Sequence, residues 1–219
     1  MLKKFRPVIC ITLVLILRAR GDAQVTFGRA IFGSNNAFPF NSDGFGANPR
    51  YQQVYKGSLF GGPTTIGSLT FFDNAAPARF ETADYTVRLS TSKFGVNSLD
   101  TVNLDSNPGA DAQLFATVHL SGATGSSFTI TGTPFNYNPS SGDLLIDITR
   151  ANAVIRSGMG ALDSMNGTAG GIFSRADNFG EEFNNWGLVT RFNFVPEPST
   201  LILLVGSVGL MSARRFRMR

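Results

Sequence analysis

Side chains able to perform acid–base, thiol or metal chemistry are few in this chain of 219 residues. The sequence has one histidine, His119, and one cysteine, Cys10. Cys10 lies in an apolar N-terminal run, so the rest of the chain has no thiol for a disulfide, a zinc site or a nucleophile. A serine triad would have to use His119, but no Gly-x-Ser-x-Gly sequence accompanies it. We interpret His119 as a surface or edge-strand residue and expect no catalytic activity.

Paired carboxylates are the alternative acid–base system. Asp143 and Asp147 fall on one face of a predicted strand, roughly 13 Å apart at ~3.3 Å per residue. This separation exceeds the ~5 to 9.5 Å between glycosidase carboxyl groups. Glu181 and Glu182 are adjacent and would point apart in a strand. Pairs assembled from different strands are left open, so a secreted hydrolase remains one alternative.

Loop oxygens could hold calcium, which takes carboxylate and amide ligands from loops. The sequence shows no EF-hand spacing, and we assign no metal and no cofactor. The residues with suitable oxygens are Asp105, Asn107, Asp111, Asn138 and Asp143.

Aromatic rings could stack on sugars if they are exposed. Tyr51, Tyr55, Tyr137 and Trp186 are the residues of this kind, and packing in the core or at a sheet edge is the competing interpretation. A carbohydrate-binding module is therefore a second alternative.

The elements that position these residues are predicted to be strands. Residues 24–195 are rich in Gly, Ser, Thr, Asn and Phe and poor in helix formers. Tyr85, Val87 and Leu89 alternate with polar residues, as a half-buried strand requires. Similar alternation recurs at residues 112–120, where Leu114 is expected to point inward, and a hairpin is expected to follow. Eight to ten such strands predict an all-β domain, a β-sandwich for which a jelly roll is one form.

The N-terminal segment predicts export. Lys3, Lys4 and Arg6 precede an apolar run over residues 8–17, and small residues end the segment at Ala23. This order is typical of a signal peptide over residues 1–23, with cleavage before Gln24.

The C-terminal segment, residues 196–219, combines three features. Pro196, Glu197 and Pro198 favour an extended backbone and precede an apolar run. A helix over residues 200–213 would be ~21 Å long, short of the ~30 Å hydrocarbon core. Basic residues then follow that resist transfer across a membrane, and they are Arg214, Arg215, Arg217 and Arg219.

This tail resembles the PEP-CTERM sorting signal of Gram-negative bacteria, a segment also labelled as an ice-binding-protein C-terminal domain. The residues that carry the resemblance are Pro196-Glu197-Pro198, the apolar residues 201–211 and the Arg214-Arg215 pair. The resemblance implies recognition by an exosortase, a transient membrane anchor, removal of the tail, and delivery to the cell surface or extracellular matrix.

The net charge of +4 belongs to the two ends of the chain. Subtracting their nine basic and two acidic residues from the totals of 19 and 15 leaves ten basic and thirteen acidic residues, a net charge of −3 for residues 24–195. An acidic body argues against a nucleic-acid partner. We therefore expect an exported surface protein with a structural or adhesive, non-catalytic body, and exopolysaccharide as one partner.

Overall fold

The protein, described here from a computed structural model, is an all-β protein, as the sequence predicted. The structure describes residues 24–28, 36–40, 50–74, 78–154, 161–165, 171–177, 182–183 and 187–195. Within these ranges the helices are three short 3-10 turns, and all strand pairs are antiparallel. The turns are η1 (Gly57–Phe60), η2 (Leu104–Ser106) and η3 (Pro139–Ser141).

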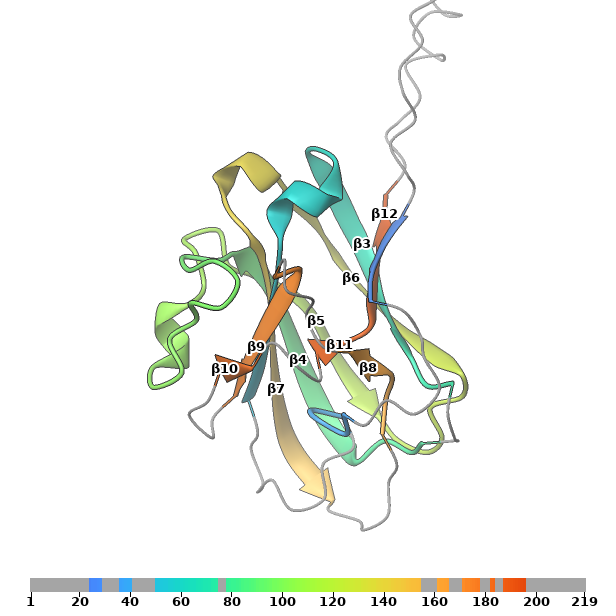
Figure 1. The fold of residues 1–219 in the computed structure, drawn as a ribbon. Helices are drawn as coiled ribbons and strands as arrows, with labels where there is room; N and C mark the ends of the chain where they lie inside the picture. Colours follow the sequence, from blue (N-terminus) through green and yellow to red (C-terminus); the bar gives the residue numbers. More distant parts are fainter. Residues whose placement is uncertain are drawn as a thin grey trace, which may run out of the picture.

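Two sheets form the body of the domain (Figure 1). The small sheet has the order β1 (Gln24–Phe27), β12 (Thr190–Phe194), β3 (Thr64–Phe72), β6 (Ser127–Tyr137). The large sheet has the order β10 (Glu182–Phe183), β9 (Phe173–Asp177), β2 (Arg50–Tyr55), β7 (Leu144–Val154), β4 (Thr82–Thr91), β5 (Gln113–Leu120). A further pair joins β11 (Gly187–Leu188) to β8 (Ser164–Met165).

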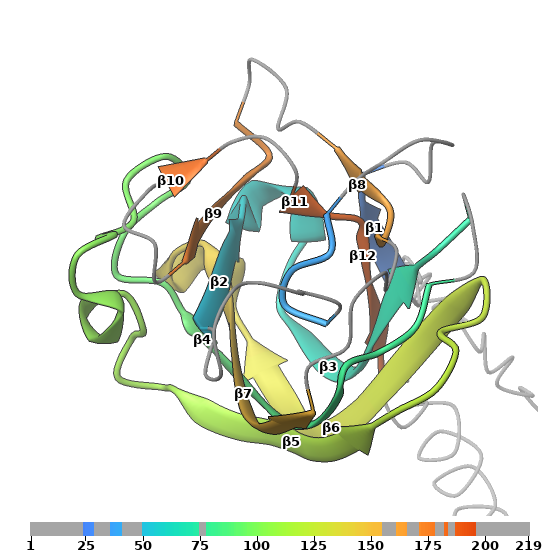
Figure 2. The same ribbon diagram turned by 90° about the horizontal axis from the view of Figure 1, so that it is seen from below.

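An aromatic core joins the inner faces of the two sheets. Phe27 of β1 and Phe192 of β12 each pack edge-on against Tyr55 of β2, with ring centroids 5.0 and 4.9 Å apart. Phe40 forms a second group with Phe71 and Tyr85, at 5.1 and 5.2 Å. All of these rings are buried, which explains why a chain with many phenylalanines folds around this interior. Figure 2 shows the strands enclosing this space.

The predicted alternation of β5 is wrong at its start. Leu114, expected inside, is 46% exposed, while Phe115 is buried. A register shift in the pairing of β4 with β5, between Val87 and Arg88, changes which side chains point inward. Beyond it the prediction holds, because Ala116 is buried, Val118 packs against the core and His119 is exposed.

The hairpin predicted from β5 and β6 is also wrong. β5 pairs with β4 in the large sheet, whereas β6 pairs with β3 in the small sheet. Residues 121–126 therefore carry the chain from one sheet to the other, and Gly122 and Gly125 adopt positive φ angles of 78° and 70° there. Figure 2 shows β5 and β6 next to each other where the sheets meet.

The first and last strands are neighbours at one edge of the small sheet (Figure 1). Gln24 lies opposite Asn193, and Phe27 lies opposite Thr190. The Val195 amide then donates to the Thr65 carbonyl at 2.8 Å. The two ends of the body thus leave the domain from the same side.

Close packing at Gly132 of β6 gives a test of this arrangement. A Cβ atom there would lie 2.4 Å from the Phe115 carbonyl oxygen and 2.6 Å from its ring. We expect Gly132→Ala to lower the free energy of unfolding by about 2 kcal/mol, because overpacking forces backbone or ring to move. Urea denaturation measures this difference.

Gly95→Ala is the matched control, since its added Cβ would meet only the Asp143 carboxylate at an ordinary 3.5 Å. It should change the free energy of unfolding by less than about 0.5 kcal/mol. Equal losses in both variants would contradict the contact between β5 and β6.

Candidate functional site

The residues of the predicted sorting and cleavage signals lie outside the described ranges. They are Ala23, Pro196, Glu197, Pro198, Arg214, Arg215, Arg217 and Arg219. Within the described ranges, no helix is long and apolar enough to cross a membrane.

His119 lies on an open sheet face. Its Nδ1 is 2.8 Å from Asp84 Oδ1, and Asn152 Nδ2 donates to the other Asp84 oxygen at 2.8 Å. The hydrogen bond from Asn152, followed by that from His119, lowers the pKa of Asp84. His119 is 61% exposed, so the pair lacks the water-excluded surroundings that strengthen electrostatic catalysis. This arrangement is a surface contact between β4, β5 and β7.

Asp143 and Asp147 serve different parts of the structure. Asp143 accepts hydrogen bonds from the amides of Gly57 and Val96, at 2.9 and 3.1 Å. Asp147 accepts two hydrogen bonds from Arg50, at 3.0 and 2.7 Å. Asp143 thus holds two loop segments, whereas Asp147 joins β7 to the neighbouring strand β2.

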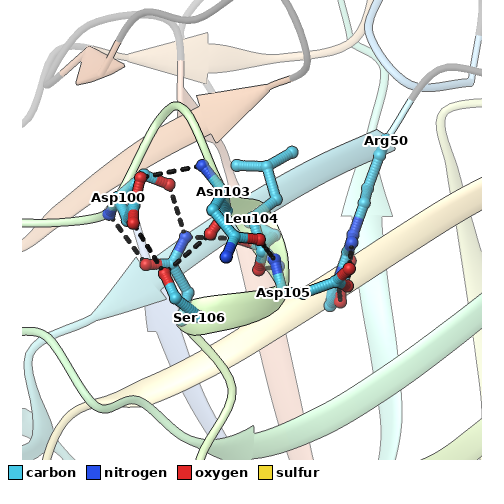
Figure 3. A network of polar contacts seen from close by, with 9 residues as sticks. Arg50, Asp100, Asn103, Leu104, Asp105 and Ser106 are labelled. Carbon is cyan, nitrogen blue, oxygen red and sulfur yellow. Dashed lines mark hydrogen bonds and ion pairs between the residues drawn. The ribbon is translucent and has the colours of Figure 1, made fainter.

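The Asp147–Arg50 pair belongs to a polar network that fastens residues 99–107 to the large sheet (Figure 3). Arg50 Nη1 also contacts Asp105 at 2.6 Å, and this hydrogen bond lowers the pKa of Asp105. Asn107, fully buried, donates to Gln52 of β2 at 2.7 Å. Beneath the network, Leu99 and Leu104 join a small apolar cluster with residues of the sheet.

Asp100 organises the turn before η2. Its carboxylate accepts from the amides of Val102 and Asn103, at 2.9 and 2.8 Å, and from the Ser106 hydroxyl at 2.9 Å. The Asn103 hydrogen bond is the largest cause of the lowered pKa of Asp100. A carboxylate held in this way acts as a local cap.

The oxygens considered for calcium are engaged separately. Asp111 accepts from the amide and hydroxyl of Thr91, and Asn138 caps η3 by accepting from the Ser140 amide at 3.1 Å. In the part of the chain that the structure describes, no cluster of three or more His, Cys, Asp or Glu side chains could hold a metal ion.

The tyrosines considered for sugar stacking are buried. Tyr51, Tyr55 and Tyr137 lie in the aromatic core, where the Tyr55 hydroxyl donates to Thr190 at 2.8 Å and that of Tyr137 to the Gly142 carbonyl at 2.7 Å. They present no ring to a ligand. Trp186 lies outside the described ranges.

The outer face of the small sheet is a different kind of surface, which we call the hydroxyl face. Its side chains follow from the strand register, and most are hydroxyls or amides. They are Gln24, Thr26, Thr65, Ser68, Thr70, Phe72, Ser127, Thr129, Thr131, Asn136, Arg191 and Asn193. Most of them are exposed or half-buried.

Cross-strand hydrogen bonds order the hydroxyl face. The Thr70 and Thr129 hydroxyls lie 2.8 Å apart, and Asn193 Nδ2 donates to Ser68 and Thr70, each at 3.0 Å. Thr65 donates to Asn136 at 2.8 Å. Beyond this last pair the face ends in a shallow, open depression lined by Pro63, Thr64, Thr65, Asn136, Tyr137 and Asn138.

Arg191 is the charged group of this face. Its guanidinium lies over the Phe72 ring, 4.8 Å from the centroid, and its Nε donates to the Thr26 hydroxyl at 3.3 Å. Within the described ranges, no carboxylate pairs with it and its two terminal nitrogens donate no hydrogen bond. These nitrogens form a fixed donor pair suited to a planar anion.

No family model, curated protein or solved structure matches this chain.

Sequence reasoning missed the hydroxyl face, although one signal pointed to it. Ser127, Thr129 and Thr131 alternate with core residues and would share a face in any strand. The remaining hydroxyls come from β1 and β3, and the Asn193 amide and Arg191 come from β12. The place of these residues beside β6 depends on strand pairing. Alternation within one segment does not predict that pairing.

Proposed function

We propose that the protein is an exported surface or extracellular-matrix protein, handled by an exosortase through its C-terminal tail and carrying a non-catalytic structural or adhesive body. The signal-peptide pattern of residues 1–23 and the tail from Pro196 to the terminal arginines support this. The strands of the body begin at Gln24 and end at Phe194, between these two segments.

The observation that carries the proposal is the pairing of the first and last strands. Because Gln24 lies opposite Asn193, both export segments attach to one side of the same sheet edge. Residues 196–200 can span at most about 17 Å when fully extended. A tail held in the bilayer would therefore keep this side of the body close to the membrane and leave Pro196 accessible between them.

We further propose that the two sheets form a β-sandwich of the jelly-roll kind. With the two-residue strands β8, β10 and β11 left aside, the chain changes sheet at every connection except those from β4 to β5 and from β7 to β9. Such alternation is expected where two Greek keys wind together. The rings from both sheets that share one core support the same architecture.

A non-catalytic body fits the use of the polar groups better than a hydrolase does. Asp84, Asp105, Asp143 and Asp147 are each bound to a backbone amide, a cation or another side chain that holds part of the fold. A screen of the protein against polysaccharides and peptides separates the two hypotheses, since turnover of any of them would favour the hydrolase.

Substitutions in the tail test the proposed handling in a host that has an exosortase. Replacing Pro196, Glu197 and Pro198 by Ala should leave full-length protein in the membrane fraction, because the extended recognition segment is lost. Replacing the four arginines by Ala should release uncut protein. The reason is that each arginine opposes transfer of the tail across the membrane by roughly a few kcal/mol at the membrane centre. Immunoblots of membrane and surface fractions distinguish these failures.

Normal cutting and release of both variants would overturn the proposal. A variant with Lys at each of the four arginines is the control, and it should be processed as the native chain is, because the positive charges remain.

A further inference from the structure

We propose that the hydroxyl face binds an acidic polysaccharide, with Arg191 pairing a uronate carboxylate and the surrounding hydroxyls and amides binding the sugar hydroxyls. This inference rests on the proposed function, because a body exported to the cell surface meets such polymers there.

The charge of the small sheet is the first argument. Residues 24–195 include thirteen acidic residues, yet none lies in β1, β3, β6 or β12. These strands contain no lysine or histidine either, and Arg191 is their one charged residue. A polyanion can thus approach this face without meeting a carboxylate from the four strands, and it finds a cation there.

The geometry of Arg191 is the second argument. Phe72 supports the plane of its guanidinium and Thr26 holds its Nε, so the side chain is fixed before a ligand arrives. A fixed guanidinium loses less conformational freedom on binding, and its terminal nitrogens match the two oxygens of a carboxylate. An isolated surface arginine would lack both features.

The shape of the face is the third argument. Small ligands favour concave apolar pockets, whereas a sheet face with a shallow end depression suits a long chain. Each Ser and Thr hydroxyl both donates and accepts, as sugar hydroxyls do. Ser127, Thr129 and Thr131 are exposed along β6, so a polymer can contact several of them in turn.

Two other interpretations of the face explain less. An exposed sheet edge is usually protected from association by charges, especially lysine, but the edge strand β1 has no charged residue and its neighbour β12 has only Arg191. Pairing with a second copy of the chain through this face would give Arg191 no acidic partner, because the same four strands of that copy contain no Asp or Glu.

The test uses the protein purified from its own host, and mass spectrometry determines its first and last residues. Isothermal titration calorimetry measures binding to alginate, a uronate polymer, and to dextran, a neutral one. We expect binding to alginate and not to dextran. Arg191→Gln should weaken alginate binding about tenfold, which corresponds to a single charge-assisted pair.

Matched variants separate the face from general charge effects. Arg88→Gln makes the same change on β4, where Arg88 is exposed on the large sheet, and should alter binding less than about twofold. Thr131→Val removes one exposed hydroxyl and should weaken binding about threefold. Urea denaturation of each variant establishes that the fold is retained.

Three outcomes would overturn the inference. They are equal binding of dextran and alginate, equal losses in Arg191→Gln and Arg88→Gln, and no binding of either polymer. The ends of the purified protein report separately on the proposed processing. A correctly processed protein that binds neither polymer would thus refute the ligand while leaving the sorting function in place.

Discussion

Replacing Arg150 by Met should lower the free energy of unfolding by about 4 kcal/mol. Arg150 Nη1 lies 2.7 Å from Glu81 Oε2, and both side chains are 0% exposed. Removing the Arg150 guanidinium takes the cation away from the buried Glu81 carboxylate, and the loss of one member of a buried ion pair is strongly destabilising. Urea denaturation of the native and variant proteins measures the loss.

The double variant Arg150→Met with Glu81→Leu shows whether the buried charge causes that loss. Replacing a whole buried ion pair by apolar residues of similar size is often nearly neutral. The double variant should therefore regain most of the stability lost in the single one. Arg88→Met is the surface control and should change the free energy of unfolding by less than about 0.5 kcal/mol. A double variant less stable than Arg150→Met would contradict this account.

Alkaline pH should unfold the protein cooperatively above about pH 10. The chain has four tyrosines, Tyr51, Tyr55, Tyr85 and Tyr137, and all are buried. Burial raises the pKa of each, and that of Tyr85 to about 12. In the unfolded chain these groups titrate near 10, so the unfolded state releases protons that the folded state keeps.

The sign of this effect follows from the raised pKa values. The stability from the neutral buried phenols is fully present below the unfolded value and is lost as the pH rises above it. Each tyrosine contributes a slope of about 1.4 kcal/mol per pH unit there, so four give roughly 5 kcal/mol per unit. A domain of ordinary stability, about 5 to 15 kcal/mol, would unfold within a few pH units.

Tyrosinate absorbance and circular dichroism, followed together, measure this transition. The absorbance should stay flat past pH 10 and then rise together with the loss of strand signal. The same protein in urea is the control and should titrate near pH 10 without a cooperative step. Ionisation of any tyrosine near pH 10 while the strand signal persists would show that its hydroxyl is accessible.

Several strands could be predicted from the sequence because their alternation is strict. Tyr85, Val87 and Leu89 of β4 are buried as expected, and Ala116 of β5 is buried on the side that the alternation of residues 112–120 indicates. Local alternation succeeds here because each strand has one side against the core.

Features that depend on which strands pair with each other could not be predicted from the sequence. The bulge of β5 turns Leu114 outward and Phe115 inward. It arises from the pairing of β5 with β4, which alternation within β5 does not reveal. The passage from β5 to β6 resembles a hairpin in sequence, because two alternating segments flank a glycine-containing turn. The choice of β3 as the partner of β6 rests on contacts such as Phe71 with Phe128, far apart in the chain.

For the polar groups, too, local spacing was informative but the partners in space could not be predicted. The spacing of Asp143 and Asp147 argues against a glycosidase pair, but their partners, Gly57 and Arg50, come from distant segments and could not be predicted. The full burial of Arg150 has no signature in the sequence, since arginine is expected at the surface. The partner that makes this burial tolerable, Glu81, lies on the neighbouring segment before β4.

Intact mass measurement of the protein taken from the cell surface tests the central claim most directly. We expect a chain that begins at or near Gln24 and ends close to Pro196, as the proposed signal-peptide removal and the proposed exosortase cleavage require. Both ends then flank the paired strands β1 and β12. A surface protein that still carries Met1, or one that retains residues 201–219, would contradict the account.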